Sequence, residues 1–234
     1  MTPMPAANII LRTSNSTRTV LDLIVPAFER ESGHKVSLLL DTAKNSLARI
    51  EAGERGDVAV LLGTSIDKLA RLGILDTASR QPFCRSTIGM AVLKGAPRPD
   101  ISTVEAFKRT LLNAKSIAHT VHGPSGAYFP GLIERLGIAE AVKPKTVTRP
   151  GGYIGVVVTA GEAEMAFQQI CELLAVPGLD VLGPIPQEIQ YHFDSQAAIF
   201  AGSENQAAAL ALLAFFARAE NASQFQAAGL EQLC

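Results

Sequence analysis

A turn rich in glycine and small residues lies near the middle of the chain, between an apolar segment and an amphipathic one. It spans His122–Tyr128, and Ser125 stands there between the Gly123-Pro124 pair and Gly126. The residues that follow have the apolar spacing of a helix. A serine at the start of a helix can be a catalytic nucleophile, part of a cradle for an anion, or a plain helix cap.

The first alternative, a catalytic nucleophile, requires the GxSxG turn of serine hydrolases. The chain has Gly123–Ala127 (GPSGA) instead, so the last glycine is replaced, and Pro124 stiffens a position where the tight turn needs freedom. His192 and Asp194 follow the serine in an order that differs from the Ser, Asp, His order of hydrolases with this turn. The sequence therefore disfavours a serine hydrolase.

The second alternative, an anion cradle, is supported by two other polar turns that lead into predicted helices. Arg12–Thr17 (RTSNST) follows the first predicted strand, and Asp41–Ser46 (DTAKNS) follows the second. The carboxyl ends of parallel strands share one edge of a sheet, so both helix starts are expected to face the same pocket as Ser125. Helix N-termini offer an anion free N–H groups and a partial positive charge.

Cationic side chains close to these turns are candidate charge partners of the anion: Arg12, Lys44 and Arg85. The third alternative stays open at each turn, because Ser16, Asn45 and Ser125 are residue types that cap helices. One such turn alone would carry no functional meaning. The three together favour a binding site for a small free anion.

Amide and titratable side chains suggest further contacts near the anion. Gln168 and Gln169 end a predicted strand and could donate and accept hydrogen bonds without adding charge. His122 has three interpretations: a general base, a ligand donor or an exposed loop residue. Glu164 has the pattern of a surface or hinge carboxylate more than that of a base.

Apolar periodicity predicts alternating strands and helices along the chain. The predicted strands are Asn8–Arg12, Lys35–Leu40, Asp57–Leu62, Thr87–Leu93, Ser116–His119, Glu164–Phe167, Leu179–Leu182 and Ala197–Phe200. The predicted helices are Val20–Phe28, Asn45–Ala52, Ser65–Leu72, Thr103–Asn113, Tyr128–Leu136 and Glu204–Ala219. This alternation predicts an α/β fold with mainly parallel sheets and right-handed crossovers.

The strand–helix pattern restarts at Arg85 without a repeat or a low-complexity linker, which predicts two lobes. We expect lobe 1 to comprise residues 1–84 with 190–234, because the C-terminal helices are expected to return to it, and lobe 2 to comprise residues 85–189. Each lobe is then a mainly parallel sheet flanked by helices. The ligand cleft is expected between the lobes, where two-lobed proteins commonly form pockets.

Composition limits the functional classes. The net charge of −1 disfavours nucleic-acid binding. No segment is long and apolar enough to predict membrane insertion. The three cysteines and four histidines lack the spacing of metal sites, and the chain has no GxxxxGK[ST] or GxGxxG motif, so we expect no metal and no nucleotide cofactor.

These segments, in this order, resemble the type II periplasmic binding proteins, and among them the branch that contains the molybdate-binding proteins of ABC transporters. The resemblance covers almost the whole chain and rests on the Thr13–Ser16 turn, VPAFERESGHKV, ARIEAGERGDVAVL, the His122–Tyr128 turn and GEAEMAFQQ. It implies hinge closure over a small anion. Through EAEMAFQQICELL and VPGLDVLGPIPQEIQ the chain is similar to a sub-branch that includes aconitate isomerase, which implies a carboxylate ligand.

Two positions depart from the molybdate-binding branch. The second turn has Thr42–Asn45 (TAKN) in place of a glycine-flanked serine, and Gln169 stands in place of a tyrosine, so specificity for a tetrahedral oxyanion is disfavoured. The resemblance and the three turns together give the set of residues expected to bind the ligand. They are Arg12, Thr13, Ser14, Asn15, Thr42, Lys44, Asn45, Arg85, His122, Ser125, Gly126, Tyr128 and Gln169.

Two functions fit this pattern. A solute-binding protein captures the anion by hinge closure and needs no titratable group at the ligand. An isomerase of the aconitate isomerase type moves a proton on a tricarboxylate and needs a base, for which His122 is the first candidate and Glu164 the second. Because the fold is used mainly for binding, we favour the binding hypothesis; a regulatory effector domain is a third, weaker alternative.

The binding hypothesis carries expectations about location and partners. If an export signal was removed upstream, we expect a periplasmic protein that works with the permease of an ABC transporter, and otherwise a cytoplasmic protein. The ligand is a small anion. We expect a monomer.

Overall fold

The chain forms two units and passes between them twice. The computed structural model describes residues 6–234, and the units separate between Arg85 and Ser86 and between Phe193 and Asp194. Unit 1 combines the N-terminal part of the chain with Asp194–Cys234, whereas unit 2 is the continuous segment Ser86–Phe193. The chain passes from one unit to the other inside β4 (Gln81–Leu93) and β9 (His192–Ile199). The sequence predicted these crossings at residues 84/85 and 189/190.

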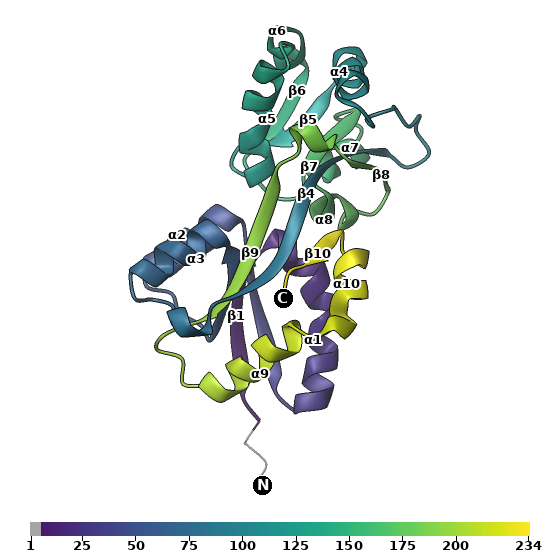
Figure 1. Cartoon of the computed structure of the whole chain (residues 1–234). Helices are drawn as coiled ribbons and strands as arrows, with labels where there is room; N and C mark the ends of the chain where they lie inside the picture. The colour runs from purple at the N-terminus through teal and green to yellow at the C-terminus, as the bar shows by residue number, and fades with distance from the viewer. Residues whose placement is uncertain (1–5) are drawn as a thin grey trace. The chain divides into compact units, whose positions relative to one another are not determined.

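Unit 1 is built on a mixed sheet whose three N-terminal strands are parallel and are followed by an antiparallel strand from later in the chain (Figure 1). The strand order is β2 (Lys35–Asp41), β1 (Asn8–Ser14), β3 (Val58–Leu62) and the later part of β9, and the short β10 (Leu230–Gln232) pairs with β4. Ser14 lies opposite Asp41, so β1 and β2 end at the same edge. The helices are α1 (Arg18–Ser32), α2 (Ala43–Glu51), α3 (Gly63–Arg71), α9 (Gln206–Phe216) and α10 (Ala222–Ala227).

Helices cover both faces of the unit 1 sheet (Figure 1). On one face, α2 and α3 enclose a buried cluster that includes Leu61 and Phe200. On the other face, α1 packs against α9 and α10, and the ring of Phe28 lies 5.5 Å from that of Phe215. Both layers use residues from the C-terminal segment, so the N-terminal segment cannot bury its apolar faces alone.

A buried carboxylate holds the beginning of β3. Asp57 is 5% exposed and accepts hydrogen bonds from the N–H of Ile10 at 2.8 Å and from Ser203 Oγ at 2.6 Å. Asn205 Nδ2 donates a third hydrogen bond, at 3.2 Å. Because a buried charge needs such donors, these contacts tie β1, β3 and the loop before α9 together.

Unit 2 has a mixed sheet with short, buried central strands. The order is β8 (Leu179–Pro184), β4, β7 (Met165–Gln169), β5 (Ile117–Thr120) and β6 (Thr146–Arg149). β4 runs antiparallel to β7 and β8, whereas β5, β6 and β7 are parallel. The helices are α4 (Val104–Asn113), α5 (Pro124–Arg135), α6 (Ala139–Val142), α7 (Gly155–Thr159) and α8 (Ile170–Leu174).

The two faces of the unit 2 sheet are filled by different side chains. On the face covered by α5, the ring of Phe129 lies 4.6 Å from Phe167 of β7 and 4.8 Å from His119 of β5. On the other face, small residues of the same strands, Ala118 and Ala166, pack against α7 and α8. The alternation along β5 and β7 is the period of two that a strand imposes.

Each strand and helix predicted from the sequence has a counterpart in the structure, with shifted ends. Six further elements were not predicted from the sequence: β6, β10, α6, α7, α8 and α10. These elements are short, and a segment of three to six residues contains too few periods to be recognised. Within residues 6–234, no helix has the combined length and apolar character that crossing a membrane requires.

Candidate functional site

Three parallel strands of unit 2 end at one edge of its sheet, where loops bring polar groups together. β5 and β6 pair as far as Thr120 opposite Arg149, and β7 runs parallel to β5. The carboxyl ends of these strands, including Gln169, therefore lie at the same edge. The N–H of His122 donates to the carbonyl of Pro150 at 3.0 Å, which holds the loop after β5 to the loop after β6.

Helix α5 begins at this edge, beside two buried hydroxyls that have no partner. Gly123 is the N-cap and Pro124 the first helical residue, so the prediction that Ser125 caps the helix is wrong. Thr120, the last residue of β5, and Ser125 are each 1% exposed. Neither hydroxyl has a hydrogen-bond partner among the described residues. An unpartnered buried polar group costs about 1–3 kcal/mol, so the pair is a candidate contact for a ligand.

Two glycines allow the end of β5 to touch the beginning of α5. A Cβ on Gly126 would lie 1.8 Å from the carbonyl oxygen of Thr120, and a Cβ on Gly123 would lie 2.4 Å from Thr120 Oγ1. Only glycine fits at position 126 without a shift of the backbone, whereas a Cβ at position 123 would collide with the Thr120 side chain. Pro124 has no N–H and the first N–H groups of a helix lack partners within it, so Ser125 and Gly126 present amides next to the hydroxyls. Such a helix start suits an anion.

The contacts of Ser125 also argue against a nucleophile. No histidine or carboxylate of the described chain is hydrogen-bonded to its hydroxyl, so no base activates it. His122, three residues earlier, is exposed. His119 is buried against Phe129, and burial lowers the pKa of its imidazole, an effect that the contact of Nδ1 with the Thr120 carbonyl at 3.0 Å partly opposes. His119 is therefore neutral near pH 7.

The two glutamines at the end of β7 hold protein groups. Gln168 accepts a hydrogen bond from the N–H of Ile154 at 2.8 Å and donates to the loop after β6 at 2.8 Å. Gln169 accepts a short hydrogen bond from Ser86 Oγ and donates to Glu172 Oε2 at 3.2 Å. Both glutamines are 2% exposed. They shape the edge, and a contact of Gln169 with a ligand stays a prediction.

Glu172, the third residue of α8, is a candidate that the sequence analysis missed. It is 9% exposed, and its carboxyl accepts hydrogen bonds from the amides of Gln169 and Gln168. Burial raises the pKa of this carboxyl to about 7, although the two hydrogen bonds lower it in part. An acidic residue in the first turn of a helix is usually exposed. Nothing in the sequence indicates that Glu172 is buried.

Glu164 lies at the opposite edge of the unit 2 sheet. Its carboxylate accepts the N–H of Lys115 at 2.5 Å, and its own N–H donates to Ser116 Oγ at 3.0 Å. Both partners precede β5, and Glu164 precedes β7, so all three lie at the amino ends of these parallel strands. The structure therefore does not bring Glu164 together with His122, and one site cannot use both as bases.

Tyr128, one turn into α5, ties this helix to the segment before β9. Its hydroxyl donates to the carbonyl of Ile189 at 2.8 Å and accepts from Arg135 Nη2 at 2.6 Å. The Arg135 guanidinium also lies 5.0 Å from the centre of the ring. The hydroxyl is thus occupied by protein groups, and a contact of Tyr128 with a ligand would come from its ring.

In unit 1, the polar turns after β1 and β2 lie at one edge, because Ser14 is opposite Asp41. The prediction that Asn45 caps α2 is wrong. Thr42 is the N-cap, and its Oγ1 accepts the N–H of Asn45 at 3.3 Å. The Asn45 side chain donates to Asp41 Oδ1 at 2.9 Å. Lys44, the second residue of α2, is exposed and forms no hydrogen bond or ion pair with residues 6–234.

The hydroxyls at the end of β1 and in the turn after it are hydrogen-bonded to one another. Thr13 is fully buried, with Oγ1 2.8 Å from the carbonyl of Val60 and 2.5 Å from Thr17 Oγ1. Ser14 Oγ lies 3.0 Å from Ser16 Oγ. Of the two residues that the sequence offers as N-cap of α1, Ser16 and Thr17, the structure has Thr17 at that position, without a side-chain cap hydrogen bond. Asn15 begins the 3-10 turn (Asn15–Thr17) between β1 and α1.

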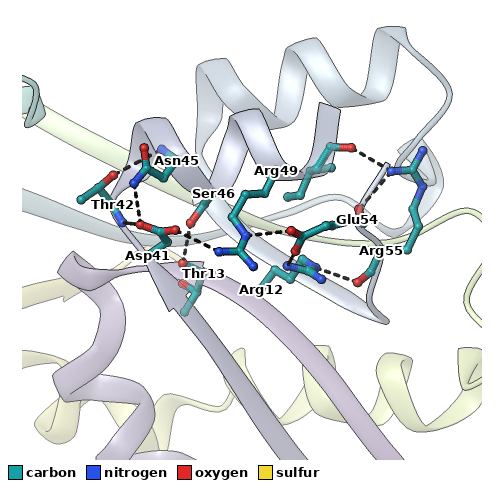
Figure 2. A network of polar contacts seen from close by, with 10 residues as sticks. Arg12, Thr13, Asp41, Thr42, Asn45, Ser46, Arg49, Glu54 and Arg55 are labelled. Carbon is teal, nitrogen blue, oxygen red and sulfur yellow. Dashed lines mark hydrogen bonds and ion pairs between the residues drawn. The ribbon is translucent and has the colours of Figure 1, made fainter. Parts of the chain in front are cut away.

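Arg12 is directed away from this edge. Its Nη1 lies 2.7 Å from the Glu54 carboxylate and its Nε donates to the carbonyl of Arg55 at 2.6 Å, as Figure 2 shows. Both partners precede β3, so they lie toward the amino ends of the parallel strands. Glu54 also accepts from Arg49 Nε at 2.9 Å, and Arg49 lies 3.7 Å from Asp41 (Figure 2). This network attaches α2 to the sheet and gives Arg12 a protein carboxylate as its partner.

Arg85 is engaged in a second ion pair within unit 1. It forms two parallel hydrogen bonds with Asp194, at 2.7 Å from Nε and 2.9 Å from Nη2, and these raise the pKa of the guanidinium. Glu231 lies 3.8 Å from its Nη1. The pair joins β4 to β9 where the chain leaves unit 1. Of the three cations expected near the anion, Lys44 alone has no carboxylate partner among the described residues.

A third helix start at the unit 1 edge was not predicted as such. α3 begins at Gly63, directly after β3, which is parallel to β1. Ser65, in its first turn, is 8% exposed. The sequence predicted that this helix starts at Ser65, because Gly63-Thr64 has the composition of a turn.

Metal and thiol chemistry find little support in residues 6–234. No group of three or more His, Cys, Asp or Glu side chains there could hold a metal ion. Cys84, Cys171 and Cys234 form no disulfide bond within the described part of the chain. Burial raises the pKa of Cys84 and of Cys234, so neither is a reactive thiolate at neutral pH.

The chain is similar in sequence to known proteins over nearly its full length. The chain matches the family described as bacterial extracellular solute-binding protein over residues 9–231. It belongs to this family. An aconitate isomerase from Pseudomonas sp is 33% identical over 233 residues, which cover 97% of this chain and 88% of that protein.

Solved structures of anion-binding proteins share the fold. The periplasmic molybdate-binding protein of Azotobacter vinelandii has a TM-score of 0.78 at 17% identity and covers 95% of this chain and 98% of its own. The sulfate-binding protein SubI of Mycobacterium tuberculosis H37Rv has a TM-score of 0.76 at 16% identity and covers 97% of this chain and 87% of its own. The predicted type II periplasmic binding protein fold is confirmed. At these identities the similarity carries no information on the ligand.

Proposed function

We propose that this solute-binding protein captures a small carboxylate anion at the edge of unit 2 where α5 begins. The observation that carries the proposal is the pair of buried, unpartnered hydroxyls of Thr120 and Ser125. They lie beside the first amides of α5, which has Gly123 as N-cap and no side-chain cap. Hydroxyls and helix amides together supply several donors to a carboxylate.

A carboxylate is favoured over a tetrahedral oxyanion by the comparisons. The relative named for aconitate, a tricarboxylate, is 33% identical to this chain. The molybdate- and sulfate-binding structures are 17% and 16% identical. The relative with the higher sequence identity is the better guide to the ligand class of this chain. Its ligand is a property of that relative and supports the proposal for this chain.

Lys44 supports anion binding at the edge of unit 1. A cation in the first turn of a helix opposes the helix dipole by about 0.3–1 kcal/mol, and a bound anion would offset this. Lys44 is exposed and forms no ion pair with a carboxylate of residues 6–234 that would do so. The hypothesis that a single anion contacts both units stays a prediction.

The decisive variant is Thr120→Val, which replaces an unpartnered hydroxyl by a methyl group of the same shape. We expect it to stabilise the free protein by about 1 kcal/mol, since a buried unpaired group is removed. We also expect it to weaken carboxylate binding about tenfold, the effect of one hydrogen bond to a charged group. Thermal unfolding without ligand and isothermal titration with trans-aconitate or citrate measure the two effects.

Matched controls separate a site from general packing. Thr148→Val makes the same change at an exposed position of the neighbouring strand β6 and should alter neither quantity. Lys44→Gln should weaken binding, whereas Arg71→Gln, at the far end of α3, should not. Equal affinities for Thr120→Val, Ser125→Ala and the unmodified protein would refute the proposed site.

The ligand class is tested by a thermal-shift screen with citrate, cis-aconitate, trans-aconitate, molybdate, tungstate and sulfate. A ligand present at one hundred times its Kd adds about 2.7 kcal/mol, which is several degrees for a chain of this size. We expect shifts with the carboxylates. Shifts with molybdate or tungstate alone would contradict a carboxylate ligand.

An isomerase is the second candidate, and the aconitate isomerase relative is the observation that favours it. The reaction removes a proton from a carbon next to a carboxylate and returns a proton at the other end of the new allylic system, so a base must reach the ligand. His122 is the candidate, because it is exposed and belongs to the same loop as the α5 start, while Glu164 lies at the other edge. Proton NMR of cis-aconitate with the protein tests this: formation of the trans isomer, lost in His122→Gln, means an enzyme, and an unchanged spectrum means a binder.

The family supports a proposal about location and partners. Solute-binding proteins of this kind are named as extracellular, and we propose that this chain acts outside the cytoplasm together with the permease of an ABC transporter. Fractionation of cells that express the full gene product would test the location. Recovery in the cytosol alone would favour an enzyme or a sensor over a transport component.

A further inference from the structure

A pocket opens at the edge of the unit 2 sheet that holds Glu164, opposite to the start of α5. It lies between α4, the loop that follows β4 and the beginning of β7, and its volume is about 360 Å³. Small-molecule sites usually have volumes of about 300–1,000 Å³. The residues that line the pocket belong to unit 2, so the pocket is complete within Ser86–Phe193. Thr120 and Ser125 are not among them.

Small side chains on one side of α4 leave this space open. Ala106, Thr110 and Ala114 are spaced by four residues, so they share one side of the helix, and all three line the pocket. Thr110 Oγ1 donates to the carbonyl of Asp100 at 2.8 Å, which attaches the loop after β4 to the helix. The walls of the pocket are therefore held by the fold.

The floor of the pocket is apolar and buried. Val92 of β4 lies opposite Met165 of β7 in the sheet, and both side chains line the pocket from below α4. Val92, Met165, Ala106 and Ala114 are all buried. An apolar group placed on this floor would release water from it, which favours a ligand with an apolar part.

The rim of the pocket carries two cations and two anions. They are Arg98, Arg109, Asp100 and Glu164. Arg98 Nη2 donates to the carbonyl of Val181 at 3.0 Å, and Asp100 Oδ1 accepts the N–H of Ser102 at 2.9 Å, so protein groups occupy these two. Because the four charges cancel, the rim favours a ligand that carries both signs over a simple anion or cation.

Arg109 and Glu164 are the rim residues with free hydrogen-bonding groups. Arg109 is exposed and forms no hydrogen bond or ion pair within residues 6–234. The pKa of the Asp100 carboxyl is lowered mainly by hydrogen bonds from Ser102 and to a smaller degree by the Arg109 guanidinium. Glu164 Oε2 accepts the N–H of Lys115 at 2.5 Å, whereas Oε1 accepts no hydrogen bond from the described part of the chain.

We propose that this pocket binds a free α-amino acid with an apolar side chain. The carboxylate of the amino acid pairs with the Arg109 guanidinium, whose donors suit two parallel hydrogen bonds. Its ammonium group pairs with Glu164 Oε1, and its side chain covers Val92 and Met165. A carboxylate without the ammonium group would leave Glu164 beside a like charge, and an amine without the carboxylate would leave Arg109 unused. This site is separate from the proposed anion site and does not depend on it.

The test is isothermal titration of the whole protein with L-leucine and L-phenylalanine at pH 7. Two analogues of leucine serve as matched probes: 4-methylpentanoate lacks the ammonium group, and 3-methylbutylamine lacks the carboxylate. We expect an amino acid to bind about tenfold more tightly than either analogue, the effect of one hydrogen bond to a charged group. No binding of either amino acid, or equal binding of leucine and 4-methylpentanoate, would overturn the proposal.

Two variants assign the two charges of the ligand. Arg109→Gln and Glu164→Gln should each weaken leucine binding about tenfold. Glutamine at position 164 keeps an oxygen that can accept the Lys115 N–H, so the start of β7 is preserved. The first variant should no longer distinguish leucine from 3-methylbutylamine, and the second should no longer distinguish it from 4-methylpentanoate. A structural role alone would not change the preference in this way.

A neighbouring cation and the NMR spectrum complete the test. Lys108→Gln, next to Arg109 but not lining the pocket, should bind leucine normally. In the nitrogen–proton spectrum of the labelled protein, leucine should shift the amide signals of Arg109 and Met165 and leave that of Gly126 unchanged. Unchanged affinity in both charge variants, or a shift at Gly126 alone, would contradict the proposal. Titration with trans-aconitate reports separately on the anion site, so failure of one proposal is distinguishable from failure of the other.

Discussion

The buried carboxyl of Glu172 is expected to make the stability of the folded protein depend on pH. Its pKa is raised from the ordinary 4.5 to about 7 in the folded protein, because burial disfavours the charged form. The folded state thus binds the proton more tightly than the unfolded chain. Stability from this group is fully present below about pH 4.5 and is lost as the pH rises toward 7.

The variant Glu172→Gln removes this titration. We expect it to match the unmodified protein near pH 4.5 and to be more stable at pH 8 by up to about 3 kcal/mol, from the 2.5-unit difference at 1.36 kcal/mol per unit. Urea unfolding at both pH values measures this. The exposed Glu140→Gln should leave the pH dependence unchanged, and a constant offset for Glu172→Gln at both pH values would contradict the prediction.

At the scale of single residues, the sequence indicated which residue types could contact an anion, but it did not show which protein groups those side chains bind. It singled out Ser125 and the glycines around it, which the structure places at a helix start beside Thr120. It could not see that Arg12 pairs with Glu54, or Arg85 with Asp194 from much further along the chain, because such pairs depend on tertiary contacts. For the same reason the burial of Glu172 had no signal in the sequence.

At the scale of elements, the close contact of β5 with α5 gives the sharpest prediction. Gly126→Ala would place a methyl group 1.8 Å from the carbonyl oxygen of Thr120, which no side-chain rotation relieves. The start of α5 must then move away from β5. We expect a loss of stability of about 1–3 kcal/mol, typical of overpacking, and loss of anion binding. Thermal unfolding and calorimetric titration measure the two effects.

The same helix supplies the control. Gly131→Ala adds its methyl group where the nearest atom is Arg135 Nη1 at 3.9 Å. Since alanine favours a helix interior over glycine by about 0.5–1 kcal/mol, this variant should be slightly more stable and should bind normally. If Gly126→Ala bound the anion as well as Gly131→Ala does, the α5 start would not be the site.

The order of strands and helices was predictable because apolar periods and glycine stops lie along the chain itself. Gly33, for example, ends α1 in the left-handed conformation at φ 74°, as the pattern Val20–Gly33 predicts. The positions of caps were less predictable, since several adjacent residues can cap. Thr42 caps α2 where Asn45 was expected, and Gly123 precedes α5 where Ser125 was expected. Glu164 lies at the amino ends of the parallel strands of unit 2 because of the direction in which β7 runs, and the local sequence pattern contains no information on strand direction.

At the scale of the whole molecule, the two units differ in how the chain builds them. Unit 2 is one continuous segment, Ser86–Phe193, and its ends meet, since Ser86 Oγ lies 3.5 Å from the carbonyl of Phe193. All partners of its sheet, β8, β4, β7, β5 and β6, lie within that segment. Unit 1 instead needs β9 beside β3 and the helices α9 and α10 over α1.

We therefore expect the segment Ser86–Phe193 to fold alone, whereas the segment that ends at Arg85 does not. The first keeps the Phe129–Phe167 core and every strand pair of its sheet, but the second loses Phe215 and Phe216 from the rings packed on Phe28 and Phe83. Circular dichroism in increasing urea should show a cooperative transition for the first segment, with a slope of about 1–3 kcal/mol per M, and no transition for the second. An unfolded Ser86–Phe193 segment would show that β4 requires its unit 1 residues, and the two units would then have to fold as one.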